Sequence, residues 1–140
     1  MKFLLDTCFL SELVKPVPEP SVLKWMEQRD DQTLFVSAMT FAELQRGVAR
    51  LAESRRRAEL TSWLAQLEVN FSDRVLPFTV ATSRYWATMC AQTEAAGRSM
   101  TAFDSIIAAS ALEHGLALVT RNVRDFSQAP VVLVNPWIDA

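Results

Sequence analysis

The segment FDSIIAASALEHGLALVTRNVRDF, residues 103–126, decides the fold. Its first part favours a helix over 101–114 that stops at Gly115, because glycine readily adopts the left-handed backbone that ends many helices. A short apolar run, LALVT at 116–120, follows at once and is typical of a buried strand. A helix that leads directly into a buried strand is typical of an α/β protein.

The rest of the chain repeats this alternation between short apolar runs and longer helical segments. Strands are predicted at 2–5, 33–37, 75–78, 116–120 and 131–134. Helices are predicted at 7–15, 21–29, 40–51, 54–68, 79–96 and 101–114. Strands separated by helices are joined by crossover connections. We therefore expect an α/β three-layer sandwich with a central, mostly parallel sheet.

Length and composition favour one compact domain over residues 1–140, and the 50% of hydrophobic residues supply an ample core. No apolar run is long enough to span a bilayer, and the N-terminus lacks the pattern of a signal peptide. We therefore expect a cytoplasmic protein that does not enter a membrane. Cys8 and Cys90 fit that compartment as free thiols, because two cysteines make no disulfide framework.

The residue inventory excludes several kinds of site. His114 is the single histidine and there are only two cysteines, so neither a multi-histidine nor an all-cysteine zinc site fits within one chain. The three glycines, Gly47, Gly97 and Gly115, are too far apart for a Gly-rich phosphate loop. All but three of the 14 basic residues are arginines, which bind phosphates and carboxylates well. This bias fits a nucleic acid or an acidic partner, and equally an arginine-preferring genome.

Four acids lie where the predicted strands end or the following helices begin. Asp6 ends the first strand, Glu43 and Asp104 lie in the first turns of their helices, and Asp125 follows LALVT. In α/β sheets, ligands bind beyond the carboxyl ends of the strands. Parallel strands therefore predict that these acids meet at one edge of the sheet.

Each acid taken singly has a simpler interpretation as part of a helix cap. Thr40 and Glu43 have the spacing of a capping box, and Thr101 and Asp104 repeat it. Asp6 is placed to cap the helix that follows it, and the helix dipole favours acids in a first turn. For a single acid, capping is the more frequent role. The prediction that all four acids meet at one edge of the sheet favours a ligand-binding site instead.

A cluster of carboxylates is strained without a cation, because each charge raises the pKa of its neighbours. Oxygen ligands favour Mg²⁺ or Mn²⁺ over Zn²⁺, and a site of this kind suits attack by water on a phosphate. Arg121 and Arg124 flank the edge within VTRNVRDF. They either clamp phosphates or belong to a solvated loop.

Three motifs resemble the PIN-domain toxins of the VapC/FitB type: LLDTCFLSEL at 4–13, SAMTFAELQRGV at 37–48, and the segment 103–126. The resemblance spans nearly the whole chain. It implies an α/β sandwich and a Mg²⁺- or Mn²⁺-dependent endoribonuclease that is the toxin of a type II toxin–antitoxin pair. It also implies an RNA substrate, often tRNA or rRNA, and a homodimer. A small antitoxin would wrap the toxin and block the acidic pocket, with a basic side chain beside an apolar groove.

The resemblance carries site roles onto particular residues. The first three family acids fall on Asp6, Glu43 and Asp104, and Asp6 and Asp104 are expected to contact the metal. The fourth position lies in a T-x-[ND]-x-x-[DEH]-F pattern. There Asp125 is expected to contribute the charge, and Asn122 to contact water, metal or substrate.

Cys8 departs from the family pattern, which usually has Asn after the Asp-Thr pair. The amide that normally ties the loops around the pocket is therefore missing. Because Cys8 replaces no charged ligand, we expect activity to be retained. The presence of Cys8 instead leaves open the local geometry of the pocket.

The alternative is a non-enzymatic module with an acidic pocket. One form is a receiver-like phospho-acceptor, and the other is a catalytically silent PIN fold that only binds a partner. A receiver domain normally needs a lysine beyond a late strand, and no lysine follows Lys24, which weighs against it. An acyl phosphate on Asp6 would favour the receiver. Tight partner binding without metal affinity would favour the silent PIN fold.

Overall fold

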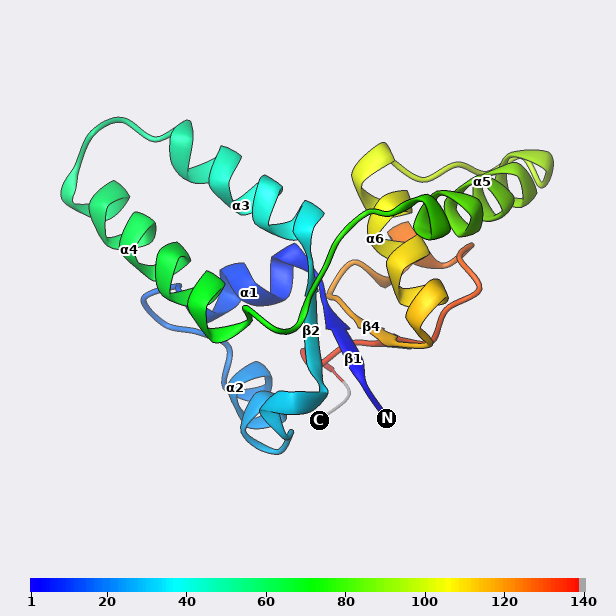
Figure 1. The fold of residues 1–140 in the computed structure, drawn as a ribbon. Helices are drawn as coiled ribbons and strands as arrows, with labels where there is room; N and C mark the ends of the chain where they lie inside the picture. The colour runs from blue at the N-terminus through cyan, green and yellow to red at the C-terminus, as the bar shows by residue number, and fades with distance from the viewer. Residues whose placement is uncertain (139–140) are drawn as a thin grey trace.

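The structure, a computed structural model, describes residues 1–138, in which strands and helices alternate as predicted (Figure 1). The strands are β1 (Phe3–Leu5), β2 (Leu34–Ser37), β3 (Val75–Leu76), β4 (Ala117–Val119) and β5 (Leu133–Val134). The α-helices are α1 (Thr7–Leu13), α2 (Pro20–Glu27), α3 (Ala38–Ala49), α4 (Arg55–Asn70), α5 (Val80–Ala95) and α6 (Ala102–His114). Short 3-10 helices are η1 (Asp31–Thr33) and η2 (Val123–Phe126).

The strands form a parallel sheet in the order β3-β2-β1-β4-β5. Its centre is β1, where Phe3 lies beside Leu34 of β2 on one side and Ala117 of β4 on the other. Parallel neighbours need long crossover connections, which the helices supply. The predicted α/β architecture with a parallel central sheet is confirmed.

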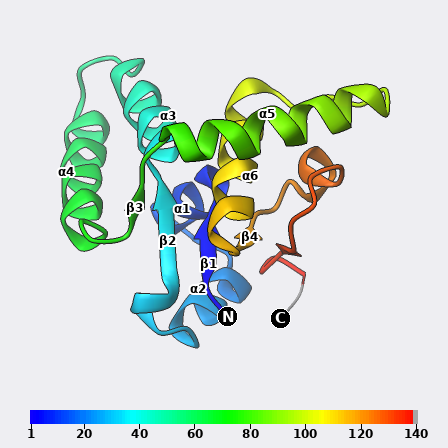
Figure 2. The same ribbon diagram turned by 45° about the vertical axis from the view of Figure 1, so that its right-hand side comes forward.

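Successive residues of the central strand enter two separate cores. Phe3 and Leu5 pack with residues of α1 to α4, whereas Leu4 packs with residues of α5 and α6. Successive side chains of a strand point to opposite faces of its sheet, so a strand that is buried throughout needs a layer on each face. Figures 1 and 2 show these two helical layers on either side of the strands.

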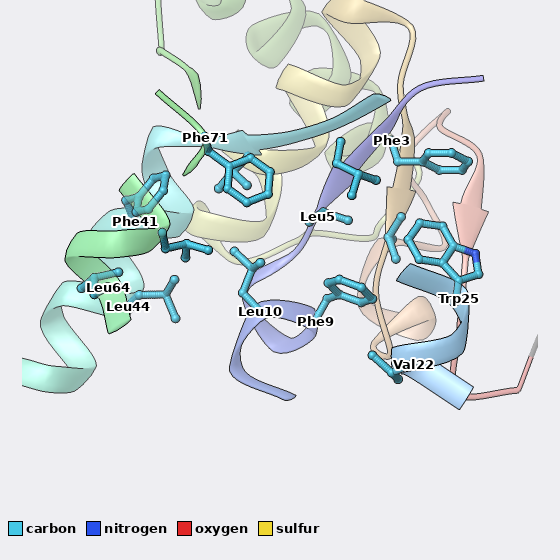
Figure 3. Close-up of a cluster of buried hydrophobic side chains, with 14 of the residues drawn as sticks. Phe3, Leu5, Phe9, Leu10, Val22, Trp25, Phe41, Leu44, Leu64 and Phe71 are labelled. Atoms are coloured by element: carbon cyan, nitrogen blue, oxygen red, sulfur yellow. The ribbon is translucent and has the colours of Figure 1, made fainter. Parts of the chain in front are cut away.

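An aromatic group anchors α1 and α2 to the central strand. The ring of Trp25 meets Phe3 edge-on at 5.0 Å and Phe9 edge-on at 5.6 Å between ring centroids. Figure 3 shows these rings together with Leu5 and Val22 in the first core. Edge-to-face contacts add to the stabilisation that burial of the rings supplies. The helix that follows Asp6 is therefore held firmly against the sheet.

The N-terminus of α3 differs from the prediction. Its cap is Ser37, whose hydroxyl accepts a hydrogen bond from the backbone N–H of Met39 at 3.1 Å. The helix therefore begins at Ala38, and the predicted capping box of Thr40 and Glu43 is wrong. Ser37 is also the last residue of β2, so strand and helix meet without a loop, and no turn residue in the sequence marks the boundary.

The outer strands are shorter than the predicted segments 75–78 and 131–134, with two residues in each of β3 and β5. Each of these strands pairs on one side only, and short edge strands limit unwanted pairing with other chains. At the end of α6, Gly115 has φ of +64°, which confirms it as the predicted helix stop. Within residues 1–138, no helix is both long and apolar enough to cross a membrane.

Candidate active site at the carboxyl edge of the sheet

The strand order places a switch point between β1 and β4, and open α/β sheets have a crevice at the carboxyl edge of such a point. From β1 the chain proceeds outward to β2 and β3, and it later returns to place β4 and β5 on the other side of β1. The crossovers therefore leave β1 and β4 in different directions, and this switch point is where open α/β sheets bind ligands. Asp6 directly follows β1 and Thr120 directly follows β4, so both lie at the switch point.

Asp6 is 4% exposed and its carboxylate oxygens have different partners. Oδ1 accepts a 2.8 Å hydrogen bond from the backbone N–H of Thr7, which caps α1. Oδ2 accepts a 2.7 Å hydrogen bond from the hydroxyl of Thr120. The predicted capping role of Asp6 is confirmed. Because Oδ1 caps α1 and Oδ2 binds Thr120, the carboxylate is fixed at the crevice.

Cys8 connects three parts of the crevice. Its thiol donates to Oδ2 of Asp6 at 3.4 Å and lies 3.4 Å from the hydroxyl oxygen of Thr120. Its sulfur accepts the backbone N–H of Arg121 at 3.4 Å. Burial, with the nearby charge of Asp6, raises the pKa of the thiol to about 11, so it stays a protonated donor at neutral pH. The thiol therefore ties the loops that an amide joins in the family pattern.

Glu43 lies in the second turn of α3, not in the first turn as predicted, and belongs to the site through a contact with α1. Its Oε1 accepts a 2.7 Å hydrogen bond from the hydroxyl of Thr7. The side chain is therefore directed toward the residue next to Asp6, rather than back to the start of its own helix. Contrary to the prediction, Glu43 is not part of a helix cap. Its structural role is instead the contact with Thr7.

Asp104 lies in the first turn of α6. The hydroxyl of Thr101 accepts the backbone N–H of Asp104 at 3.3 Å, which confirms Thr101 as the cap. Burial is the main cause that raises the pKa of Asp104, and the negative charges of Asp6, Asp125 and Glu43 raise it further. These four carboxylates are therefore close enough for their charges to interact, as expected from a parallel sheet.

The residues after β4 form an exposed loop that enters η2. The backbone N–H of Asn122 donates to the hydroxyl of Thr120 at 3.0 Å, and the N–H of Asp125 donates to the carbonyl of Asn122 at 3.0 Å. Asn122, Arg121, Arg124 and Asp125 are all exposed. The loop therefore leaves these four side chains accessible to a ligand.

The chemistry of the site fits a hard cation. Within residues 1–138, no three His, Cys, Asp or Glu side chains are already arranged as a coordination shell. The carboxylates supply only oxygen donors. In addition to burial, repulsion by the neighbouring carboxylates raises the pKa of Asp104, and a bound cation neutralises this repulsion. The donor set thus suits Mg²⁺ or Mn²⁺.

Two threonines of the site were not identified from the sequence. Thr7 holds Glu43, and Thr120 holds Asp6. Each threonine lies beside an acid or at the end of a strand, so an exhaustive search for hydroxyls at these ends would have found them. The sequence does not say which acid each hydroxyl contacts, because the partners are distant along the chain.

An apolar groove of about 270 Å³ adjoins the site between α1, α3 and α4. Its walls include Leu44, Val48, Leu60 and Trp63, and Glu43 also lines it. The groove therefore runs from an apolar surface to the acidic crevice. A ligand that lies in it can contact both.

A family model described as PIN domain matches residues 3–132 of the chain. VapC ribonuclease Y4jK of Sinorhizobium fredii is 37% identical over 95% of this chain and 96% of its own length. Toxin FitB of Neisseria gonorrhoeae is 34% identical over 97% of this chain and 99% of its own length. These similarities extend through all the elements that carry the candidate site.

The fold is also that of a solved relative. The crystal structure of FitAcB from Neisseria gonorrhoeae contains a chain that superposes with a TM-score of 0.92 at 34% identity, covering 97% of this chain and 99% of that one. Sequence and fold thus agree with the resemblance in the three motifs. The chain belongs to the PIN domain family, with relatives named VapC and FitB.

Proposed function

We propose that this protein is the toxin of a type II toxin–antitoxin system and acts as a Mg²⁺-dependent endoribonuclease. The observation that carries the proposal is the pair of acids held at the carboxyl edge of the sheet, where Thr120 holds Asp6 and the neighbouring Thr7 holds Glu43. Relatives that share almost the full length are named a ribonuclease and a toxin, which supports this activity and role. The proposed substrate is RNA, with tRNA and rRNA as the first candidates.

Asp6 and Asp104 are the proposed ligands of Mg²⁺, for which Mn²⁺ can substitute. Bound there, the cation supplies an acidified water and neutralises charge on the phosphate. Asp6 is suited to hold a ligand in a fixed place because Thr7 and Thr120 fix its oxygens. Oδ1 accepts only the N–H of Thr7 and retains a further lone pair for a ligand, whereas Oδ2 accepts from both Thr120 and Cys8.

Glu43 and Asp125 are proposed to accept the proton of the attacking water or to orient the other groups. The hydrogen bond from Thr7 occupies one oxygen of Glu43 and keeps the carboxylate turned toward the crevice. Arg121 and Arg124 are proposed to bind the phosphates that flank the cleaved bond, with Asn122 as a further substrate contact. Their exposure supports this role.

The proposed partner is a small antitoxin whose apolar side chains fill the groove of Leu44, Val48, Leu60 and Trp63. Because Glu43 lines the same groove, a basic side chain of the partner would reach the acidic site and inhibit cleavage. A homodimer, alone or within a toxin–antitoxin assembly, is proposed on family resemblance. Light scattering of the purified chain and of the complex tests both states.

The central experiment is RNA cleavage with and without Mg²⁺. Wild type is expected to cleave only with the metal, and Asp104→Asn to lose cleavage. The matched control is Glu53→Gln, which removes an exposed acid from the connection between α3 and α4 and is expected to leave cleavage unchanged. Metal-dependent cleavage by Asp104→Asn would show that the site assignment is wrong. A wild type that binds its partner but neither metal nor RNA would instead be a silent PIN fold.

A further inference from the structure

Two arginines beside the acidic site each lie over an aromatic ring. Arg46 of α3 has its guanidinium carbon 5.1 Å from the ring centre of Phe103. Arg46 is one helical turn beyond Glu43, and Phe103 directly precedes Asp104. The contact therefore joins α3 and α6, the two helices that carry these acids.

The second pair lies on the side of β1 and β4. Arg121, which directly follows Thr120, has its guanidinium carbon 5.7 Å from the ring centre of Trp137. The Nε1–H of Trp137 donates to Glu12 at 3.4 Å, and its backbone N–H donates to Oδ1 of Asn135 at 3.0 Å. The indole is therefore fixed in place, and it offers a firm support to Arg121.

Neither arginine takes part in the ion pairs found among residues 1–138. A ring contacts the face of a guanidinium, whereas phosphate is bound by the N–H groups at its edge. Arg46 and Arg121 are also both exposed. Each ring thus restrains the arginine while the N–H donors stay available to a ligand.

We propose that Arg46 and Arg121 are two phosphate contacts that hold RNA across the acidic site, with Phe103 and Trp137 as their positioning residues. The proposal rests on the proposed ribonuclease function. It adds Arg46, Phe103 and Trp137 to the substrate surface, and none of these residues was assigned a role from the sequence. A ring-supported arginine loses less side-chain freedom on binding, so it contributes more affinity than an unsupported one.

The first experiment measures binding of a fluorescent, mixed-sequence single-stranded RNA in EDTA, so that cleavage does not compete. Affinity is recorded against salt concentration for wild type, Arg46→Gln, Arg121→Gln and the double variant. Each lost phosphate contact lowers the slope of log K against log salt by about 0.7 for single strands. We expect a decrease of about 0.7 in each single variant and about 1.4 in the double variant.

The matched control is Arg84→Gln, because Arg84 is exposed on α5 near the other end of α6. Thr82, in the first turn of α5, donates to Glu113 in the last turn of α6, which places this region away from Asp104. The control slope is expected to equal that of wild type. Slopes of Arg46→Gln and Arg121→Gln equal to that of the control would overturn the proposal.

The second experiment tests the rings. Phe103→Leu and Trp137→Leu are expected to weaken RNA binding roughly 2- to 5-fold, the size of an exposed cation–π contact. Phe103→Tyr and Trp137→Phe are expected to restore it. In a double-mutant cycle, Phe103→Leu should cost little once Arg46 is Gln, because the ring acts through that arginine. Fully additive losses in folded variants would overturn the positioning role.

Cleavage kinetics separate this proposal from the proposed function. With Mg²⁺, Arg46→Gln and the two ring variants to Leu are expected to raise KM for RNA and leave kcat within about 2-fold. Wild type that cleaves RNA, with arginine variants that leave both salt slope and KM unchanged, would overturn the phosphate contacts alone. Wild type without any RNA cleavage or binding would overturn the ribonuclease function and this inference with it.

Discussion

Thr120 donates a 2.7 Å hydrogen bond to Oδ2 of Asp6 and joins the ends of β4 and β1 at the switch point of the sheet. Both residues are buried, with exposed fractions of 0% for Thr120 and 4% for Asp6. A buried carboxylate keeps its charge only when hydrogen bonds or opposite charges compensate the lost solvation. This bond therefore holds the Asp6 carboxylate at the switch point of the sheet.

Replacing Thr120 with Val should weaken metal binding and cleavage roughly 10- to 100-fold, the usual cost of losing a partner that orients a metal ligand. Cleavage rate and the shift in Tm on titration with Mn²⁺ measure the effect. Thr82→Val is a matched control, because Thr82 is also fully buried and donates to a carboxylate, that of Glu113, at 2.7 Å. Equal loss of metal affinity in both variants would contradict a specific role for Thr120.

Replacing Asp104 with Asn should stabilise the metal-free protein. Burial disfavours the charged form of Asp104, and the charges of Asp6, Asp125 and Glu43 repel it further, so Asn removes an unfavourable charge at similar volume. We expect Tm in EDTA to rise by on the order of 2 °C and the increase in Tm caused by Mg²⁺ to be lost. Differential scanning calorimetry measures both. A lower Tm in EDTA would argue against repulsion among these acids.

Replacing Cys8 with Ala should reduce cleavage, because it removes the contacts to Asp6, Thr120 and the backbone of Arg121. Cys8→Asn should retain activity, since an amide supplies both donors and an acceptor. The ratio kcat/KM measures the difference, and Cys90→Ala is the control for loss of a thiol elsewhere. Full activity of Cys8→Ala would show that the thiol is dispensable for the loop geometry.

Glu12 should make stability depend on pH. The hydrogen bond from Lys15, aided by the backbone N–H of Glu19, the charge of Lys15 and the indole of Trp137, holds the pKa of Glu12 below its ordinary value against the opposing effect of burial. A lowered folded-state pKa means that the stabilisation is present above the unfolded pKa of about 4.3. It is lost as the pH falls through the lower folded-state pKa.

Urea unfolding of Glu12→Gln tests this dependence. The variant should have a smaller free energy of unfolding near pH 7 and a shallower decrease in that free energy below about pH 4. Glu27→Gln, an exposed acid of α2, is the control and should follow wild type. Parallel pH curves for Glu12→Gln and wild type would rule out the Glu12 contribution.

Replacing Leu51 with Arg should weaken inhibition by a basic antitoxin without affecting cleavage. Leu51 is 39% exposed and lines the groove, so arginine is tolerated there while its charge and bulk oppose the partner. The measurement is inhibition of RNA cleavage by the protein encoded in the neighbouring reading frame. Leu23→Arg, at a similarly exposed leucine of α2 with 38% exposure, is the control. Equal inhibition of both variants would place the partner elsewhere.

The fold was predictable because its signals are local. The apolar runs at LALVT and around Leu4 mark strands that are buried on both faces, and Gly115 marks a helix end. The boundary of α3 was missed because Ser37 ends the strand and caps the helix at once. Thr40 and Glu43 match a capping box in spacing, but the earlier cap at Ser37 took precedence.

By itself the sequence determined the alternation of strands and helices, the kinds of residue available for a site, and the acids that follow strands or begin helices. Only the tertiary structure decided which of them meet. Thr120 and Asp6 are 114 positions apart, and Glu43 and Thr7 are 36 apart. Their contacts exist because the parallel order β2-β1-β4 brings separate strand ends to one edge. Local propensity carries no information about that long-range pairing, which burial of apolar surface on both faces of the sheet stabilises.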